Sequence, residues 1–125
     1  MGLFGKSKKE KEKEYMQVID VPQCLKENFE LTIDDVFTII GTGTVVAGNA
    51  TSGMCRVGES AYINKTNGEV LDTTITLIDV HTKQRKPNEC GYRTENMGIG
   101  LRGIDKEQVE KGDKLVVKNA GMYGI

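Results

Sequence analysis

The sequence is poor in the residues that build metal sites and disulfide frameworks. Its 125 residues include one histidine, three cysteines and no tryptophan. Cys24, Cys55 and Cys90 lie far apart without any C-x-x-C spacing, and an odd, sparse set of cysteines suits a reducing compartment better than a disulfide framework. Because the familiar ligand spacings of zinc are missing too, we expect neither a metal nor any other cofactor.

Long hydrophobic runs are also missing. No apolar stretch approaches the roughly 20 residues of a transmembrane helix, and no signal-peptide core follows the N-terminal lysines. The first residues do not match the myristoylation pattern, because Lys6 stands where that pattern needs serine or threonine. These absences predict a soluble, cytoplasmic protein that has no membrane partner.

The formal net charge is only −1, but the charges are unevenly distributed. Residues 1–14 contain five lysines and three glutamates, whereas the rest of the chain contains 12 basic and 15 acidic residues. An acidic body argues against strong non-specific binding to nucleic acid, which needs a basic field. A local basic patch remains compatible with this composition.

Residues 1–27 are predicted to form a charged, flexible N-terminal tail and a lead-in segment to the folded domain. The alternating lysines and glutamates can pair along a transient helix, but no apolar stripe is present to dock it. We interpret the tail as mainly solubilising, with a weak electrostatic role at an anionic surface as the alternative. Pro22 disfavours a long regular element in the lead-in segment.

Most of the chain after the lead-in segment has the pattern of β-structure. Phe29, Leu31 and Ile33 alternate with polar residues, which is the period of a half-buried strand. The pair Asp34-Asp35 breaks this alternation. A β-bulge at the pair would bend the strand, as a small barrel requires.

Turn signals divide the remainder into short strands. Asn67-Gly68 predicts a type I′ hairpin, and the strand that follows is expected to place Ile75, Leu77 and Asp79 on one face. Further along, glycines 98 and 100 alternate with apolar residues, which predicts a crowded or sharply bent face. About six short strands with glycines at the corners predict an all-β fold, with a small antiparallel barrel over residues 28–118 and a short tail over residues 119–125.

No motif of catalysis stands out. The run Gly41–Gly43 is similar to part of a dinucleotide loop, but the third glycine of that loop would fall at Val46 and no helix follows. A Cys–His–Asp arrangement of Cys90, His81 and Asp79 is conceivable, although no sequence signature surrounds the cysteine. The sequence therefore predicts a protein that is not an enzyme.

A basic cluster with a neighbouring aromatic is the main polar feature. It comprises His81, Lys83, Arg85, Lys86 and Arg93, with Tyr92 beside it. Basic side chains and an aromatic ring in one loop suit an RNA backbone and an unstacked base. The alternative is an ordinary solvated connection between strands.

Over about ninety residues, Phe29 to Val117, the sequence resembles the second domain of elongation factor Tu, the β-barrel shared by translational GTPases. The resemblance lies in an ordered string of segments with glycines at matching corners: residues 29–39, 41–48, 57–59, 96–104 and 109–116. It implies a closed or nearly closed antiparallel Greek-key barrel, translation-factor domain-2-like. No counterpart of the family's nucleotide-binding domain precedes this segment, so we expect no GTP binding.

The resemblance also implies what the barrel contacts. In elongation factor Tu the barrel helps to hold the aminoacyl end of transfer RNA, and in its relatives it touches the small ribosomal subunit. Glu95 matches a family acidic residue beside the terminal adenosine. The charged Arg-x-Glu-Arg run of the family is replaced here by the neutral Asn49–Ser52.

The sequence thus predicts a free-standing, non-catalytic barrel that binds ribosomal or transfer RNA, the ribosome or another translation component. The rival interpretation is a protein–protein adaptor that has lost the RNA-binding surface. The residues expected at the contact surface are Lys83, Arg85, Lys86, Tyr92, Arg93, Glu95 and Arg102.

Overall fold

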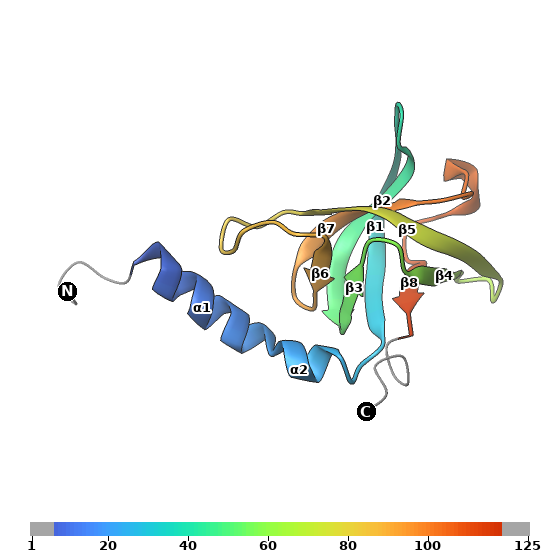
Figure 1. The fold of residues 1–125 in the computed structure, drawn as a ribbon. Coiled ribbons are helices and arrows are strands. Elements are labelled where there is room, and N and C mark those ends of the chain that lie inside the picture. Colours follow the sequence, from blue (N-terminus) through green and yellow to red (C-terminus); the bar gives the residue numbers. More distant parts are fainter. Residues whose placement is uncertain (1–6, 119–125) are drawn as a thin grey trace.

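In a computed structural model, which describes residues 7–118, six antiparallel strands close into a barrel (Figure 1). The strands follow one another around the barrel in the order β1-β2-β7-β5-β4-β8. Their bounds are β1 (Phe29–Ile39), β2 (Gly43–Ser52), β4 (Ser60–Asn64), β5 (Val70–Val80), β7 (Asn96–Leu101) and β8 (Lys114–Val117). The expectation of a small all-β barrel is confirmed.

Two short strands and a 3-10 turn flank the barrel, and two helices precede it. Strands β3 (Met54–Arg56) and β6 (Cys90–Tyr92) pair into a separate two-stranded sheet. A single 3-10 turn, η2 (Lys106–Gln108), comes before β8. Helix α1 (Lys8–Ile19) and the short helix α2 (Val21–Cys24) lie ahead of β1.

Alternate residues of the strands point into one apolar core. On β1 these are Phe29, Leu31 and Ile33, each at most 1% exposed. The bulge expected at the acidic pair is confirmed, because the pairing with β2 shifts register between Ile33 and Asp35. Beyond it the phase is reversed, so that Val36 packs against the core.

Two further register shifts were not expected, one between Glu30 and Leu31 in the pairing of β1 with β2 and one on β5. The pairing with β7 shifts register between Ile75 and Leu77, so the prediction that these two residues share a face is wrong. Ile75 and Ile78 belong to the core, whereas Leu77 is 36% exposed. Nothing in the run of β-branched and apolar residues marks this shift, because every residue in it suits either face of a strand.

The hairpin between β4 and β5 forms as expected, but its turn is not of type I′. The amide of Gly68 donates to the carbonyl of Lys65 (3.0 Å), and the positive φ of this turn falls on Gly68 and not on Asn67. The distant Asp113 bonds to this turn, since its carboxylate accepts from the amide of Thr66 (3.0 Å) and from Lys65 Nζ (2.9 Å).

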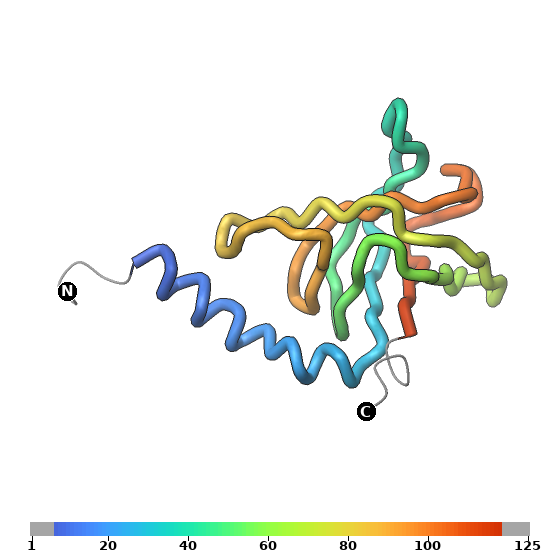
Figure 2. The backbone as a smooth tube through the Cα atoms, in the orientation of Figure 1, coloured from blue at the N-terminus to red at the C-terminus, as the bar shows by residue number. Residues whose placement is uncertain are grey.

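The N-terminal segment differs from the predicted flexible tail over residues 8–19, which form α1. Ser7 caps the helix, and Asp20 ends it in the left-handed conformation (φ 59°). The helix is held because its last turns dock: Tyr15, Met16 and Ile19 pack in a small cluster with Met54 and Tyr92 of the two-stranded sheet. Figure 2 shows α1 beside the connection from β5 to β6. Pro22 lies in the first turn of α2, where proline is tolerated.

Candidate functional site

Three of the residues expected at a contact surface lie in the interior. Arg85, Tyr92 and Glu95 are 6%, 6% and 3% exposed. The guanidinium of Arg85 donates hydrogen bonds to both carboxylate oxygens of Glu95, at 2.7 and 3.0 Å. It also lies 4.7 Å from the centre of the Tyr92 ring. The amide of Tyr92 also donates to Glu95 (2.9 Å).

This buried network uses every donor of Arg85. The remaining guanidinium hydrogens reach the carbonyl of Lys86 (3.2 Å), the side chain of Asn88 (2.9 Å) and the carbonyl of Cys90 (2.8 Å). A guanidinium has five N–H donors, and all five are engaged. Arg85 therefore shapes the connection from β5 to β6, residues 81–89, and has no donor left for a phosphate.

Helix α1 closes the same network. The hydroxyl of Tyr15 donates to Glu95 Oε2 at 2.6 Å. Burial, and then the hydrogen bond to this carboxylate, raise the pKa of Tyr15 to about 12. Glu95 thus receives hydrogen bonds from α1, β6 and the 81–89 connection, which explains why a charged residue is stable at this position.

The other four expected residues do not form one patch. Lys83 and Lys86 are exposed on the 81–89 connection. Arg93 is half-buried, because its Nε donates to the carbonyl of Ile19 (2.9 Å) at the end of α1. Arg102 follows the far end of β7, about 20 Å of strand away from the start of that strand.

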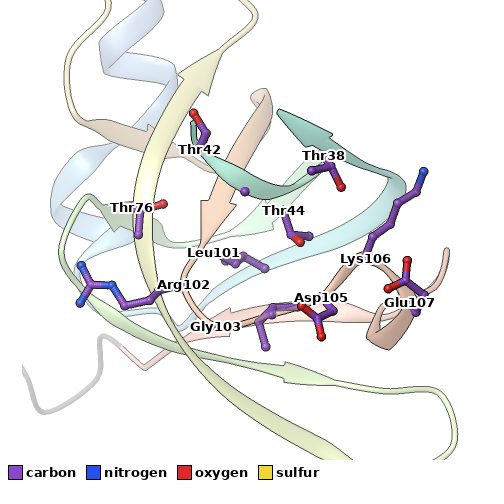
Figure 3. Close-up of a pocket in the computed structure, with 12 residues that line it drawn as sticks. Thr38, Thr42, Thr44, Thr76, Leu101, Arg102, Gly103, Asp105, Lys106 and Glu107 are labelled. Carbon is purple, nitrogen blue, oxygen red and sulfur yellow. The ribbon is translucent and has the colours of Figure 1, made fainter. Parts of the chain in front are cut away.

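Arg102 lines a different pocket, shown in Figure 3. This pocket is rich in threonine, and Figure 3 shows Arg102 and Lys106 on opposite sides of it. Acidic residues balance both cations, since Asp105 and Glu107 line the pocket as well. The pocket therefore has no excess of positive charge that would attract a polyanion.

An apolar row crosses the outer face of the barrel. The strand registers place Phe37, Val45, Gly100 and Leu77 side by side on β1, β2, β7 and β5. The adjacent row of Val36, Val46, Ile99 and Ile78 packs in the core, so the first row lies on the other face of the strands, and we call it the outer apolar row. Val45 is covered there (2% exposed) and Gly100 is buried, so the exposed apolar surface of this row comes from Leu77 (36% exposed) and the half-buried Phe37.

Gly100 is required in the outer apolar row. A Cβ atom at that position would lie 3.0 Å from the Cβ of Leu77 and 2.7 Å from the hydroxyl of Thr76. Because glycine has no Cβ atom, Leu77 can lie close over β7. The crowded face expected at this glycine is confirmed.

Polar side chains continue the same outer face. Asn49 and Asn96 are paired across β2 and β7, and the Asn96 amide nitrogen donates to Asn49 Oδ1 (3.0 Å). His81 Nδ1 lies 2.6 Å from Asn96 Oδ1, and its Nε2 lies 3.5 Å from Asp79. We call these four exposed side chains the polar row.

Sequence reasoning did not assign a role to Phe37, Val45, Asn49 or Asn96. The alternation of Gly98 and Gly100 with apolar residues was the signal that could have pointed to this face, because it marks where side chains of neighbouring strands close over β7. The pairing of strands far apart in sequence supplied the rest.

The Cys–His–Asp arrangement considered from the sequence includes Cys90, whose side chain is partly buried. His81 does contact Asp79, but burial raises the pKa of the Cys90 thiol, which lowers the fraction of reactive thiolate at neutral pH. Among residues 7–118, no three histidine, cysteine or acidic side chains gather as metal ligands would. None of the helices in this part of the chain has the length and apolar character needed to span a membrane.

No known protein-family model matches the sequence. The outer face and the 81–89 connection are therefore the features of the molecule that bear on its function.

Proposed function

We propose that this protein is a non-catalytic, translation-factor-like barrel that binds single-stranded ribosomal or transfer RNA with the outer face of β5 and β7. One observation carries the proposal. Strand β5 presents Leu77 and Asp79 outward, and the 81–89 connection follows with His81, which contacts Asp79, and then with Lys83 and Lys86. Apolar, hydrogen-bonding and cationic groups thus follow one another along one continuous stretch of the chain.

Each of these groups suits one part of a nucleotide. Apolar and aromatic surfaces receive the face of an unstacked base, and Leu77 and Phe37 of the outer apolar row supply such a surface. Amide, imidazole and carboxylate groups such as those of the polar row bond base edges and the 2′-hydroxyl. Lysines bind phosphates without regard to sequence. The phosphates would lie on the 81–89 connection, and the base would lie toward Leu77.

The resemblance to the barrel of elongation factor Tu adds a translation context to this proposal. We do not carry over the contact with the terminal adenosine that the resemblance implies for Glu95. Its carboxylate already accepts from Arg85, Tyr92 and Tyr15, so we propose no RNA contact for it and place the contact on the neighbouring polar row.

Charge reversal tests the proposal. The double variant K83E/K86E is expected to weaken binding of single-stranded RNA by more than about tenfold at about 0.1 M salt, because each phosphate contact contributes about 0.7 to the salt slope. Anisotropy of a labelled RNA measures the affinity, and co-sedimentation with ribosomes measures the larger partner. The control K111E/K114E changes two exposed lysines on the β8 side of the barrel. Equal binding by wild type and K83E/K86E would contradict the proposal.

A protein–protein adaptor is the second candidate. The hairpin between β1 and β2 projects from the barrel (Figure 1), and at its tip Ile40 is fully exposed. A mostly apolar protein interface predicts a shallow response to added salt, whereas phosphate contacts predict a steep one. Ile40→Asp should abolish partner retention in the first case and leave RNA affinity unchanged in the second.

A further inference from the structure

Two lysine-bearing segments that are distant in sequence meet on one side of the molecule. Lys8 and Lys9 of the first turn of α1 line a hollow of about 460 Å³ together with Lys83 and Lys86 of the 81–89 connection. An adjoining hollow of about 570 Å³ is lined by Lys8, Lys11 and Lys83, by Gln84, and by Glu14, Tyr15 and Val18 of α1. We call the two hollows together the helix–loop groove.

The lysines of this groove are available to a partner. Lys8, Lys9, Lys83 and Lys86 are all exposed, and none of them forms an ion pair with a carboxylate in the described part of the chain. The nearby carboxylate of Glu12 is already engaged, since it accepts from the backbone amide of Lys86 at 2.6 Å. The groove is therefore a basic surface on a chain whose body is acidic.

Three contacts set the position of α1 against the connection. The first is the bond from the Lys86 amide to Glu12, and the second is the bond from the Arg93 side chain to the carbonyl of Ile19. The third, from Tyr15 to Glu95, ties the middle of the helix to the buried network that also holds Arg85. Undocking of α1 would separate Lys8 and Lys9 from Lys83 and Lys86.

We infer that the phosphate backbone of a single-stranded RNA lies in the helix–loop groove, and that Tyr15 is a positioning residue that keeps the two pairs of lysines together. This inference rests on the proposed function and extends its surface to α1. Helix docking and RNA binding are then thermodynamically linked, so that each favours the other. Tyr15 itself acts through Glu95 and does not need to touch RNA.

Salt-dependent binding of oligouridylate to the full chain tests this linkage. K8Q/K9Q removes two cations and is expected to reduce affinity by on the order of tenfold and the salt slope by about 1.4. Tyr15→Ala should produce the same two changes by undocking α1. Glu95 keeps its bonds from Arg85 and Tyr92 in this variant, so the barrel remains folded, and Tyr15→Phe, which retains the ring, should recover part of the affinity.

Combining the changes separates positioning from a general loss of structure. In the Tyr15→Ala background, K8Q/K9Q should have almost no further effect, because the two lysines have already left the groove. Amide exchange of residues 15–19 should be faster in Tyr15→Ala and slower in wild type when oligouridylate is bound. The control K111Q/K114Q removes the same charge from the β8 side.

The outcomes distinguish this inference from the proposed function. If wild type does not bind oligouridylate even at low salt, the proposed function fails and this inference fails with it. If wild type binds and K83E/K86E does not, but Tyr15→Ala and K8Q/K9Q bind normally, the inference alone is overturned. Additive effects of Tyr15→Ala and K8Q/K9Q would also overturn it, because the tyrosine and the lysines would then act independently.

Discussion

The barrel and the helix–loop region are held together by different kinds of contact. In the barrel, six strands pair in a closed ring around an apolar core, so the stabilising contacts are spread over many residues. In the helix–loop region, α1 and the 81–89 connection meet around Glu95, whose carboxylate joins Arg85, Tyr92 and Tyr15. A distributed core tolerates the weakening of one contact, whereas in the helix–loop region three of the polar contacts converge on one carboxylate, so its loss removes them together.

Loss of that carboxylate should have the largest effect. Glu95→Ala leaves the guanidinium of Arg85 buried without its counter-ion, which costs about 3 to 5 kcal/mol. We expect urea denaturation to show this loss and amide exchange to show that α1 is released. Glu89→Ala, an exposed glutamate of the same connection, is the matched control. If Glu95→Ala had wild-type stability, water would be able to solvate Arg85 in place of the carboxylate. That result would contradict the importance of Glu95 for the helix–loop region.

A cavity in the barrel core should come next. Ile99 is fully buried in the main cluster, and Ile99→Ala is expected to cost about 2 to 5 kcal/mol. Unlike Glu95→Ala, it should lower the melting temperature without speeding exchange in α1 more than in the strands. Val70→Ala, which truncates a side chain that is 56% exposed, should be close to neutral. Selective release of α1 by Ile99→Ala would contradict the separation of the two regions.

The barrel has a polar anchor of its own at Asp113. Burial alone would raise the pKa of this carboxyl, but bonds from the Glu110 and Thr66 amides and from Lys65 lower it. Its contribution is therefore present above the ordinary pKa of aspartate and is lost as the pH falls through the lowered value. Asp113→Asn should cost about 1.5 to 3 kcal/mol near neutral pH. The loss should shrink in acid, as unfolding curves across the acid range can measure, with exposed Asp72→Asn as control.

The smallest expected effect belongs to the hydroxyl of Tyr15. Tyr15→Phe should cost about 0.5 to 1.5 kcal/mol, visible as faster exchange in α1 and not as a change in global unfolding. Because the pKa of Tyr15 is raised from 10.0 to about 12, its contribution is full below pH 10 and is lost as the pH rises toward 12. Absorbance titration of wild type against Tyr15→Phe measures that transition. Tyr62→Phe is the control, and equal exchange in α1 would argue against the docking role.

Local sequence patterns predicted the barrel well where a break in the pattern was visible. The acidic pair at residues 34 and 35 interrupts the alternation on β1, and the bulge lies there. On β5 the residues around Thr76 suit both faces of a strand, so the register shift there left no mark in the sequence. Asn67-Gly68 predicted a hairpin. The turn that forms is bonded to Asp113, which lies 46 residues away from Asn67 and could not be paired with it from the local pattern.

The candidate site was harder to predict than the fold. A loop rich in lysine and arginine is expected to be exposed, and Lys83 and Lys86 are exposed. The fate of Arg85 depended on Glu95 and Tyr15, which are 10 and 70 residues away. No local pattern encodes such a network, because each residue would be ordinary at a surface without the other two.

The sequence by itself determined the all-β barrel, since alternating apolar residues, glycines and turn residues act over a few neighbouring positions. Only the tertiary structure decided that α1 docks, that Arg85 and Glu95 are buried, and that lysines about 75 residues apart in the chain share one groove. These features depend on desolvation and charge pairing between distant segments. Their free energy exists only when the barrel has already brought those segments together.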